Sequence, residues 1–155
     1  MAQVYGDKGH GHDQKYSLWR REQFPKIAQR RDCYCSDLDW VEWRNGKPVA
    51  LLECRRAIGT LKTAEAVIAH FTVLNNGFQL EMYARLSYEL KIPAFLIAIE
   101  DRNLEKDDYA DARFIVEKIT PPDNWPEGRL NLKQIILTEM GIYNQEEYAQ
   151  FLASL

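Results

Sequence analysis

The chain has 155 residues, of which 46% are hydrophobic and 28% are charged, and its formal net charge at pH 7 is −3. This length suits one domain with a substantial hydrophobic core. The weakly acidic balance excludes a generally basic nucleic-acid binder, but it leaves room for a nuclease, because acidic site residues count against the total charge.

The three cysteines, Cys33, Cys35 and Cys54, and the lack of a signal peptide indicate reduced thiols inside a cell. Their spacing does not fit a zinc site with paired C-x₂-C motifs, and three cysteines cannot build a four-cysteine iron–sulfur cluster. No apolar run approaches the length of a membrane span. We therefore expect a cytoplasmic protein without a membrane partner.

The amino-terminal region combines a predicted tail and a predicted helix. Residues 1–14 are rich in Gly, His and Asp, which predicts a disordered tail, so that a single domain spans residues 15–155. Residues 16–30 predict the first helix, with Ser17 as its N-cap and apolar side chains at helical spacing. Glu22 lies on this helix.

A β-hairpin is predicted around Asn45-Gly46, which two β-rich runs flank at about 33–44 and 47–55. A two-residue loop would put Asp39 and Glu53 on opposite faces of the hairpin. A three-residue loop over 44–46, with the glycine in a bulge, puts the odd-numbered residues on one face. We expect the second arrangement.

In that arrangement four polar side chains project together: Asp37, directly opposite Glu53, with Asp39 and Arg55 beside them. Like charges across a strand pair are destabilising. A divalent cation such as Mg²⁺ or Mn²⁺ would remove the repulsion. The alternative is a solvated sheet face that carries ordinary surface charges.

The remaining elements follow from hydrophobic periodicity and turn residues. We predict helices over 62–74 and 77–91, a doubly buried parallel strand in the run 91–100, an exposed edge strand over 112–119, a loop over 120–130, and closing helices over 131–140 and 144–154. Asn144 is the expected cap of the last helix. This order predicts an α/β fold with a central mixed sheet, an antiparallel hairpin plus a parallel strand, flanked by helices.

Asp39, followed after a hydrophobic strand by Glu53-Cys54-Arg55, resembles the D…(D/E)-x-K signature of the PD-(D/E)XK nuclease superfamily. Arg55 occupies the position of the usual lysine. Gln79 and Tyr83, one helical turn apart, resemble the Q-x-x-x-Y motif of the exonuclease-type branch. The resemblance covers residues 16–119 and implies a restriction-endonuclease-like core.

The resemblance also implies a site. It suggests Mg²⁺ or Mn²⁺ held by Asp39, Glu53 and the backbone carbonyl of Cys54, with Asp37 as an alternative ligand and Glu22 as an additional acid. Arg55 can stabilise charge on a phosphate but cannot act as a general base, because it stays protonated. Either Lys62 replaces the missing lysine, or metal carries the catalysis, or the site is attenuated or inactive.

Nucleic acid, with DNA as the expected substrate, would be bound through phosphate contacts from Arg20, Arg21, Arg30, Arg56 and Lys62. Each of these residues alone is as readily explained as a solvated surface charge. The four tryptophans are expected to be core or interface anchors, and a patch at Trp43 could support a homodimer.

The sequence therefore predicts a metal-dependent nuclease. One alternative is a catalytically inactive nuclease-fold module that binds nucleic acid or a protein partner. Another is a structural or regulatory protein whose carboxylates face solvent.

Overall fold

The computed structural model describes residues 38–73, 77–103, 105, 106, 108–125 and 132–155, together with positions 15, 19, 22 and 23. The chain divides into two units, Met1–Asp37 and Leu38–Leu155. The predicted tail and most of the predicted first helix lie outside the described residues. Within that helix, Trp19, Glu22 and Gln23 are helical.

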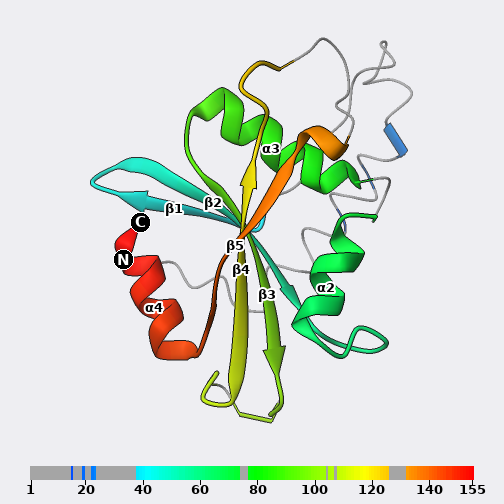
Figure 1. The fold of residues 1–155 in the computed structure, drawn as a ribbon, viewed down its shortest axis with the longest axis vertical. Helices are drawn as coiled ribbons and strands as arrows, with labels where there is room; N and C mark the ends of the chain where they lie inside the picture. The colour runs from blue at the N-terminus through cyan, green and yellow to red at the C-terminus, as the bar shows by residue number, and fades with distance from the viewer. Residues whose placement is uncertain are drawn as a thin grey trace. The chain divides into compact units, whose positions relative to one another are not determined.

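The unit Leu38–Leu155 contains one mixed sheet in the order β1-β2-β3-β4-β5 (Figure 1). The strands are β1 (Trp40–Arg44), β2 (Lys47–Arg56), β3 (Ala94–Asp101), β4 (Ala112–Thr120) and β5 (Ile136–Tyr143). Strands β2 and β3 run parallel, and the other neighbouring pairs run antiparallel. These pairings confirm the predicted α/β class, with a hairpin and a parallel strand in one sheet.

Helices cover both faces of this sheet. They are α2 (Ala64–Phe71) and α3 (Phe78–Leu90), between β2 and β3, and α4 (Gln145–Ser154), after β5. Successive strand side chains point to opposite faces, so Leu51 packs in a core with α3, whereas Leu52 belongs to the core beside α4. Figure 1 shows α2 and α3 on one side of the sheet and α4 on the other. None of the described helices is long and apolar enough to cross a bilayer.

Helices α2 and α4 begin at residues whose side chains satisfy free backbone N–H groups, whereas α3 begins at Gly77 without a side-chain cap. The hydroxyl of Thr63 accepts a hydrogen bond from Ala66 N at 3.1 Å at the start of α2. As predicted, Asn144 caps α4: its side chain accepts from Glu147 N, and the Glu147 carboxylate accepts from Asn144 N, both at 2.9 Å. This reciprocal capping box sets the first turn of α4.

The prediction of a helix over 131–140 is wrong. A short 3₁₀ turn, Leu132–Gln134, is followed by strand β5. A short apolar run fits a strand and a helix equally well, and here antiparallel pairing with β4 decides the outcome. Gly141 also suits the strand, since a Cβ there would overlap the Tyr143 ring, which folds back over the glycine.

The prediction that strand 112–119 is an exposed edge is wrong for the same reason. Because β5 pairs with β4, β4 lies inside the sheet and β5 forms its edge. Val116 and Ile119 are fully buried, on opposite faces of β4. The error follows from the unrecognised neighbour rather than from the side chains of β4.

Candidate functional site: the β2–α3 cluster

The hairpin between β1 and β2 closes with two residues. Asn45 and Gly46 both have positive φ, 50° and 74°, as a type I′ turn requires. Arg44 pairs with Lys47 across this turn. The predicted three-residue loop is therefore wrong.

A β-bulge in β1 changes which side chains of the two strands share a face of the hairpin. The register shifts by one residue within β1, and beyond the shift Trp40 pairs with Leu52. One position further, this register sets Asp39 opposite Glu53. Asp39 is thus the acid that this register sets opposite Glu53, whereas Asp37, which was predicted to lie there, is outside the described residues. The two-residue turn and the bulge together keep the odd-numbered residues on one face, as predicted, but the pairing is displaced by two residues from the predicted one, in which Asp37 lay opposite Glu53.

Glu53 is the most buried acid of this region, with 4% of its surface exposed. Its Oε1 lies 2.8 Å from Nη2 of Arg55. Burial raises the pKa of Glu53 above its usual value, and the negative charge of Asp39 raises it further. Hydrogen bonding to Tyr83 and the charge of Arg55 oppose this shift in pKa. The carboxylate therefore has two protein partners that stabilise its charge.

Tyr83 ties helix α3 to the hairpin. Its side chain is completely buried, and its hydroxyl donates to the carbonyl of Leu52 at 3.4 Å and accepts from Asp39 N at 3.2 Å. Burial, with contributions from Glu53 and Asp39, raises the pKa of this phenol, so it remains protonated at neutral pH. The hydroxyl consequently keeps its single hydrogen, which the carbonyl of Leu52 and the carboxylate of Glu53 share, while its oxygen accepts from Asp39 N.

Arg55 is held by three neighbours. Its Nη2 donates to Oε1 of Gln79 and pairs with Glu53, and its Cζ lies 5.2 Å from the centroid of the Phe71 ring. Its Nε is buried and has no hydrogen-bond partner among the described residues. Sequence reasoning missed Phe71, because its spacing from Val67 on α2 indicated only a core position.

Asp39 differs from Glu53 in being exposed. Its Oδ2 accepts a hydrogen bond from Cys54 N at 3.0 Å, which draws the carboxylate against β2. Burial raises the pKa of the Cys54 thiol to about 12, so this thiol stays protonated and is a poor metal ligand. Cys54 can therefore contribute only backbone groups to the site. Asp39, Glu53, Arg55, Gln79 and Tyr83 are called the β2–α3 cluster below.

The oxygen donors of this cluster fit Mg²⁺ or Mn²⁺ in kind. Within the described part of the chain, no group of three or more His, Cys, Asp or Glu side chains is arranged to hold a metal ion. Mg²⁺ commonly takes only one or two protein carboxylates and completes its octahedron with water and phosphate oxygens. Asp39 and Glu53, with the Cys54 carbonyl, meet that requirement, although Arg55 competes for Glu53.

Two other predicted site residues of the unit Leu38–Leu155, Lys62 and Arg56, are not part of the cluster. Lys62 is an exposed residue before α2, and no hydrogen bond or ion pair joins it to Glu53 among the described residues. Arg56 is exposed at the end of β2. Glu22 is an exposed helical residue of the unit Met1–Asp37. The remaining predicted residues lie outside the described part: Asp37, Arg20, Arg21 and Arg30.

Two tryptophans on β1 are open to solvent. Trp40 and Trp43 are 56% and 57% exposed, which rules out a core role. Their exposure is compatible with the predicted role as interface anchors, and the homodimer at Trp43 stays a prediction. Trp125, by contrast, packs with Tyr88 at a ring-centroid distance of 5.8 Å and under the Arg85 guanidinium.

No protein-family model, curated protein or solved structure matches this chain. The resemblance to the PD-(D/E)XK superfamily thus rests on the sequence motifs, while the arrangement of the β2–α3 cluster is a property of this fold.

Proposed function

We propose that this protein is a metal-dependent nuclease that hydrolyses phosphodiester bonds, with DNA as its expected substrate and the β2–α3 cluster as its site. One observation carries the proposal: the carboxylate of Asp39, directly before β1, accepts a hydrogen bond from Cys54 N on β2 and lies close enough to Glu53 for its charge to raise the pKa of that acid. The Q-x-x-x-Y residues of α3 reach the same place, since Tyr83 contacts Asp39 N and Gln79 contacts Arg55. This combination also supports a restriction-endonuclease-like core.

Each residue of the cluster has a distinct task in this proposal. Asp39 and Glu53 offer carboxylate oxygens to Mg²⁺ or Mn²⁺, which when bound supplies positive charge that lowers the pKa of a water and neutralises the phosphate. Tyr83 holds the segment of Asp39 against β2 through its hydroxyl. Gln79 holds Arg55, which remains protonated and donates to a phosphate oxygen.

The proposal gives Arg55 an electrostatic role. A guanidinium forks onto phosphate but does not take up a proton from an attacking water. If the usual lysine contributes proton transfer as well as charge, we expect Arg55→Lys to raise the cleavage rate by about a hundredfold, the lower end of what a positioned proton-transfer group contributes. An unchanged or lower rate in Arg55→Lys would show that the site is adapted to arginine.

A specific observation favours a second candidate function, a catalytically inactive module that binds nucleic acid. The charge of Glu53 is already compensated by Arg55 at 2.8 Å, so the buried carboxylate is stable without a metal ion. In this case the fold keeps the cluster as a structural ion pair, and basic residues such as Arg56 and Lys62 contact phosphates without cleavage.

The test uses supercoiled plasmid and labelled single-stranded DNA, each incubated with Mg²⁺, Mn²⁺ or EDTA. The variants are Asp39→Asn and Glu53→Gln, which keep side-chain shape while removing a charge. Glu117→Gln is the matched control, because Glu117 is a partly buried acid of the same sheet but lies on β4, two strands away from β2. All variants are compared with the parent protein by circular dichroism and thermal melting.

Cleavage that needs the metal, is lost in Asp39→Asn and Glu53→Gln and persists in Glu117→Gln supports the nuclease. Salt-dependent binding without cleavage under any metal condition supports the inactive module instead. Neither binding nor cleavage contradicts both candidates. Cleavage that survives in folded Glu53→Gln would assign the activity to another site or to a contaminant.

A further inference from the structure

Among the described residues, no strand pairs with the outer side of β5, and this edge is apolar. Ile136, Met140 and Ile142 are 58%, 46% and 48% exposed, which is unusual for three large apolar residues on one eight-residue strand. An edge strand presents unpaired N–H and C=O groups, and proteins commonly protect such strands with Lys or Pro. β5 contains neither residue, and its only charged side chain is Glu139.

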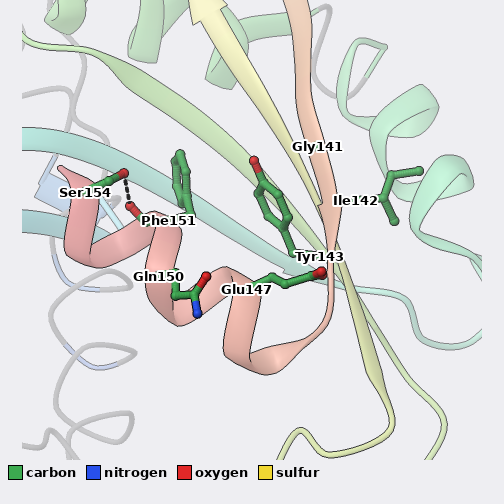
Figure 2. Close-up of a pocket in the computed structure, with 7 residues that line it drawn as sticks. All are labelled: Gly141, Ile142, Tyr143, Glu147, Gln150, Phe151 and Ser154. Carbon is green, nitrogen blue, oxygen red and sulfur yellow. Dashed lines mark hydrogen bonds between the residues drawn. The ribbon is translucent and has the colours of Figure 1, made fainter.

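A pocket lies directly beside this edge. It has a volume of about 500 Å³ and is lined by Gly141, Ile142 and Tyr143 of β5 and, among others, by Glu147, Gln150 and Phe151 of α4. Figure 2 shows the rings of Tyr143 and Phe151 side by side, and Ile142 on the other side of β5. Neighbouring residues that point to opposite faces can line one pocket only where it opens past the strand edge. The pocket therefore continues the open edge.

The two walls of the pocket have complementary characters. The rings of Tyr143 and Phe151 stack with centroids 5.9 Å apart and form an apolar floor. The α4 wall carries Glu147 and Gln150, which lie on one helix face at a spacing of three residues. An open strand edge next to a helix wall is the geometry in which an extended peptide adds as a further strand, with alternate side chains entering the groove.

The charge of this surface selects its partner. From Gln134 to Leu155 the chain contains three acids, Glu139, Glu146 and Glu147, and no Lys, Arg or His. Nucleic acid is disfavoured here because this segment itself offers no cation to phosphates, and the neighbouring cations Lys133, before β5, and Lys118 of β4, opposite Thr138, are outnumbered by the three acids. A second copy of β5 is disfavoured because it would bring two sets of the same three acids together. A basic partner is favoured, because it brings positive charges to the three acids instead of phosphates or further carboxylates.

We propose that the β5 edge and the β5–α4 pocket bind an extended, basic peptide segment of a partner protein by strand addition. The peptide backbone pairs with the free edge of β5, an apolar side chain rests on Tyr143 and Phe151, and flanking Lys or Arg side chains face the three acids. The site lies on the fifth strand of the sheet, separate from the cluster on β2, and does not depend on the proposed nuclease.

The probe is a capped peptide of alternating Val and Lys, eight residues long to match β5, added to ¹⁵N-labelled full-length protein. We expect amide shifts in Ile136–Tyr143 and at the α4 residues of the pocket. An analogue with alternate backbone nitrogens methylated has the same charge but cannot pair, and should bind at least about tenfold more weakly. A Val–Glu peptide should not bind.

One protein variant tests the edge itself. Glu139→Lys places a protective cation on β5 and should weaken peptide binding about fivefold or more. Glu105→Lys, at an exposed loop position, makes the same change in net charge and should alter binding by less than about twofold. Melting curves establish that both variants are folded.

Four outcomes would overturn the proposal. They are the absence of shifts on β5, shifts centred elsewhere, equal binding of the methylated analogue, and equal weakening by Glu105→Lys. A concentration-dependent dimer that buries β5 in the absence of peptide, detected by light scattering, would assign the edge to a second copy instead. Shifts on β5 that disappear with methylation and in Glu139→Lys support strand addition.

Discussion

Replacing Tyr83 with Phe removes a single oxygen from the centre of the β2–α3 cluster. The ring of Tyr83 is completely buried against the core, so the phenylalanine ring occupies the same space. The lost hydroxyl contacts the carbonyl of Leu52, the N–H of Asp39 and the carboxylate of Glu53. The variant therefore isolates the contribution of these polar contacts to stability.

The three contacts do not contribute equally. Asp39 is exposed, so its N–H regains a partner in water. Glu53 is buried but keeps Arg55 at 2.8 Å, and the contact to Leu52 is long, at 3.4 Å. An unpaired buried polar group costs about 1–3 kcal/mol, and these compensations place Tyr83→Phe in the lower half of that range, at about 1–2 kcal/mol.

The assay is urea unfolding followed by circular dichroism, with the midpoint and the slope fitted together. Tyr109→Phe is the matched control, because it removes a hydroxyl from a partly exposed ring while keeping the edge-to-face contact with Phe114. We expect the control to change the unfolding free energy by less than about 0.5 kcal/mol. If Tyr83→Phe changes it no more than the control does, the hydroxyl does not bridge the helix and the hairpin, and the assembly of the cluster described above is refuted.

Two further predictions concern pH. Glu117 on β4 pairs directly with Glu139 on β5. The pKa of Glu117 is raised mainly by burial and to a smaller extent by the negative charge of Glu139. Because the charged form of Glu117 is disfavoured in the folded state, Glu117→Gln should stabilise the protein by about 0.2–1 kcal/mol at pH 7. This gain in stability should vanish as the pH falls and Glu117 becomes protonated. A difference in melting temperature that stays constant with pH would contradict this prediction. Arg113 lowers the pKa of both Glu65 and Glu100 through ion pairs of 2.6 and 2.9 Å. Depressed carboxyl pKa values stabilise the fold above the unfolded pKa and lose that effect in acid, so Arg113→Gln should lower the melting temperature at pH 7 but not near pH 3; equal losses at both pH values would indicate a packing effect instead.

Local pattern was sufficient for much of this fold. The Asn45-Gly46 dipeptide predicted the position of the hairpin, although the three-residue loop expected for it was wrong, and periodicity predicted helices α2, α3 and α4 close to their observed positions. Buried strand β3 followed from an unbroken apolar run before any neighbour was known. These features succeed because turn conformation, helix capping and side-chain period are properties of a few consecutive residues.

The pairing of strands that are distant in sequence could not be predicted from local pattern. The run Ile136–Tyr143 is compatible with either period, and only its partner β4 selects the strand. That choice in turn moved β4 from the edge of the sheet to its interior. The contact of Phe71 with Arg55 likewise depends on the packing of α2 against β2, which local pattern does not reveal.

The β2–α3 cluster also contains relations that local pattern predicts and one relation that it does not. The sequence by itself determined that an acid precedes β1, that Glu53 and Arg55 share one face of β2, and that Gln79 and Tyr83 share one face of α3, since these relations depend only on fixed periods of two and 3.6 residues. Only the tertiary structure decided that Asp39 faces Glu53, because a one-residue bulge exchanges the faces of a strand pair and long-range packing determines whether such a bulge forms.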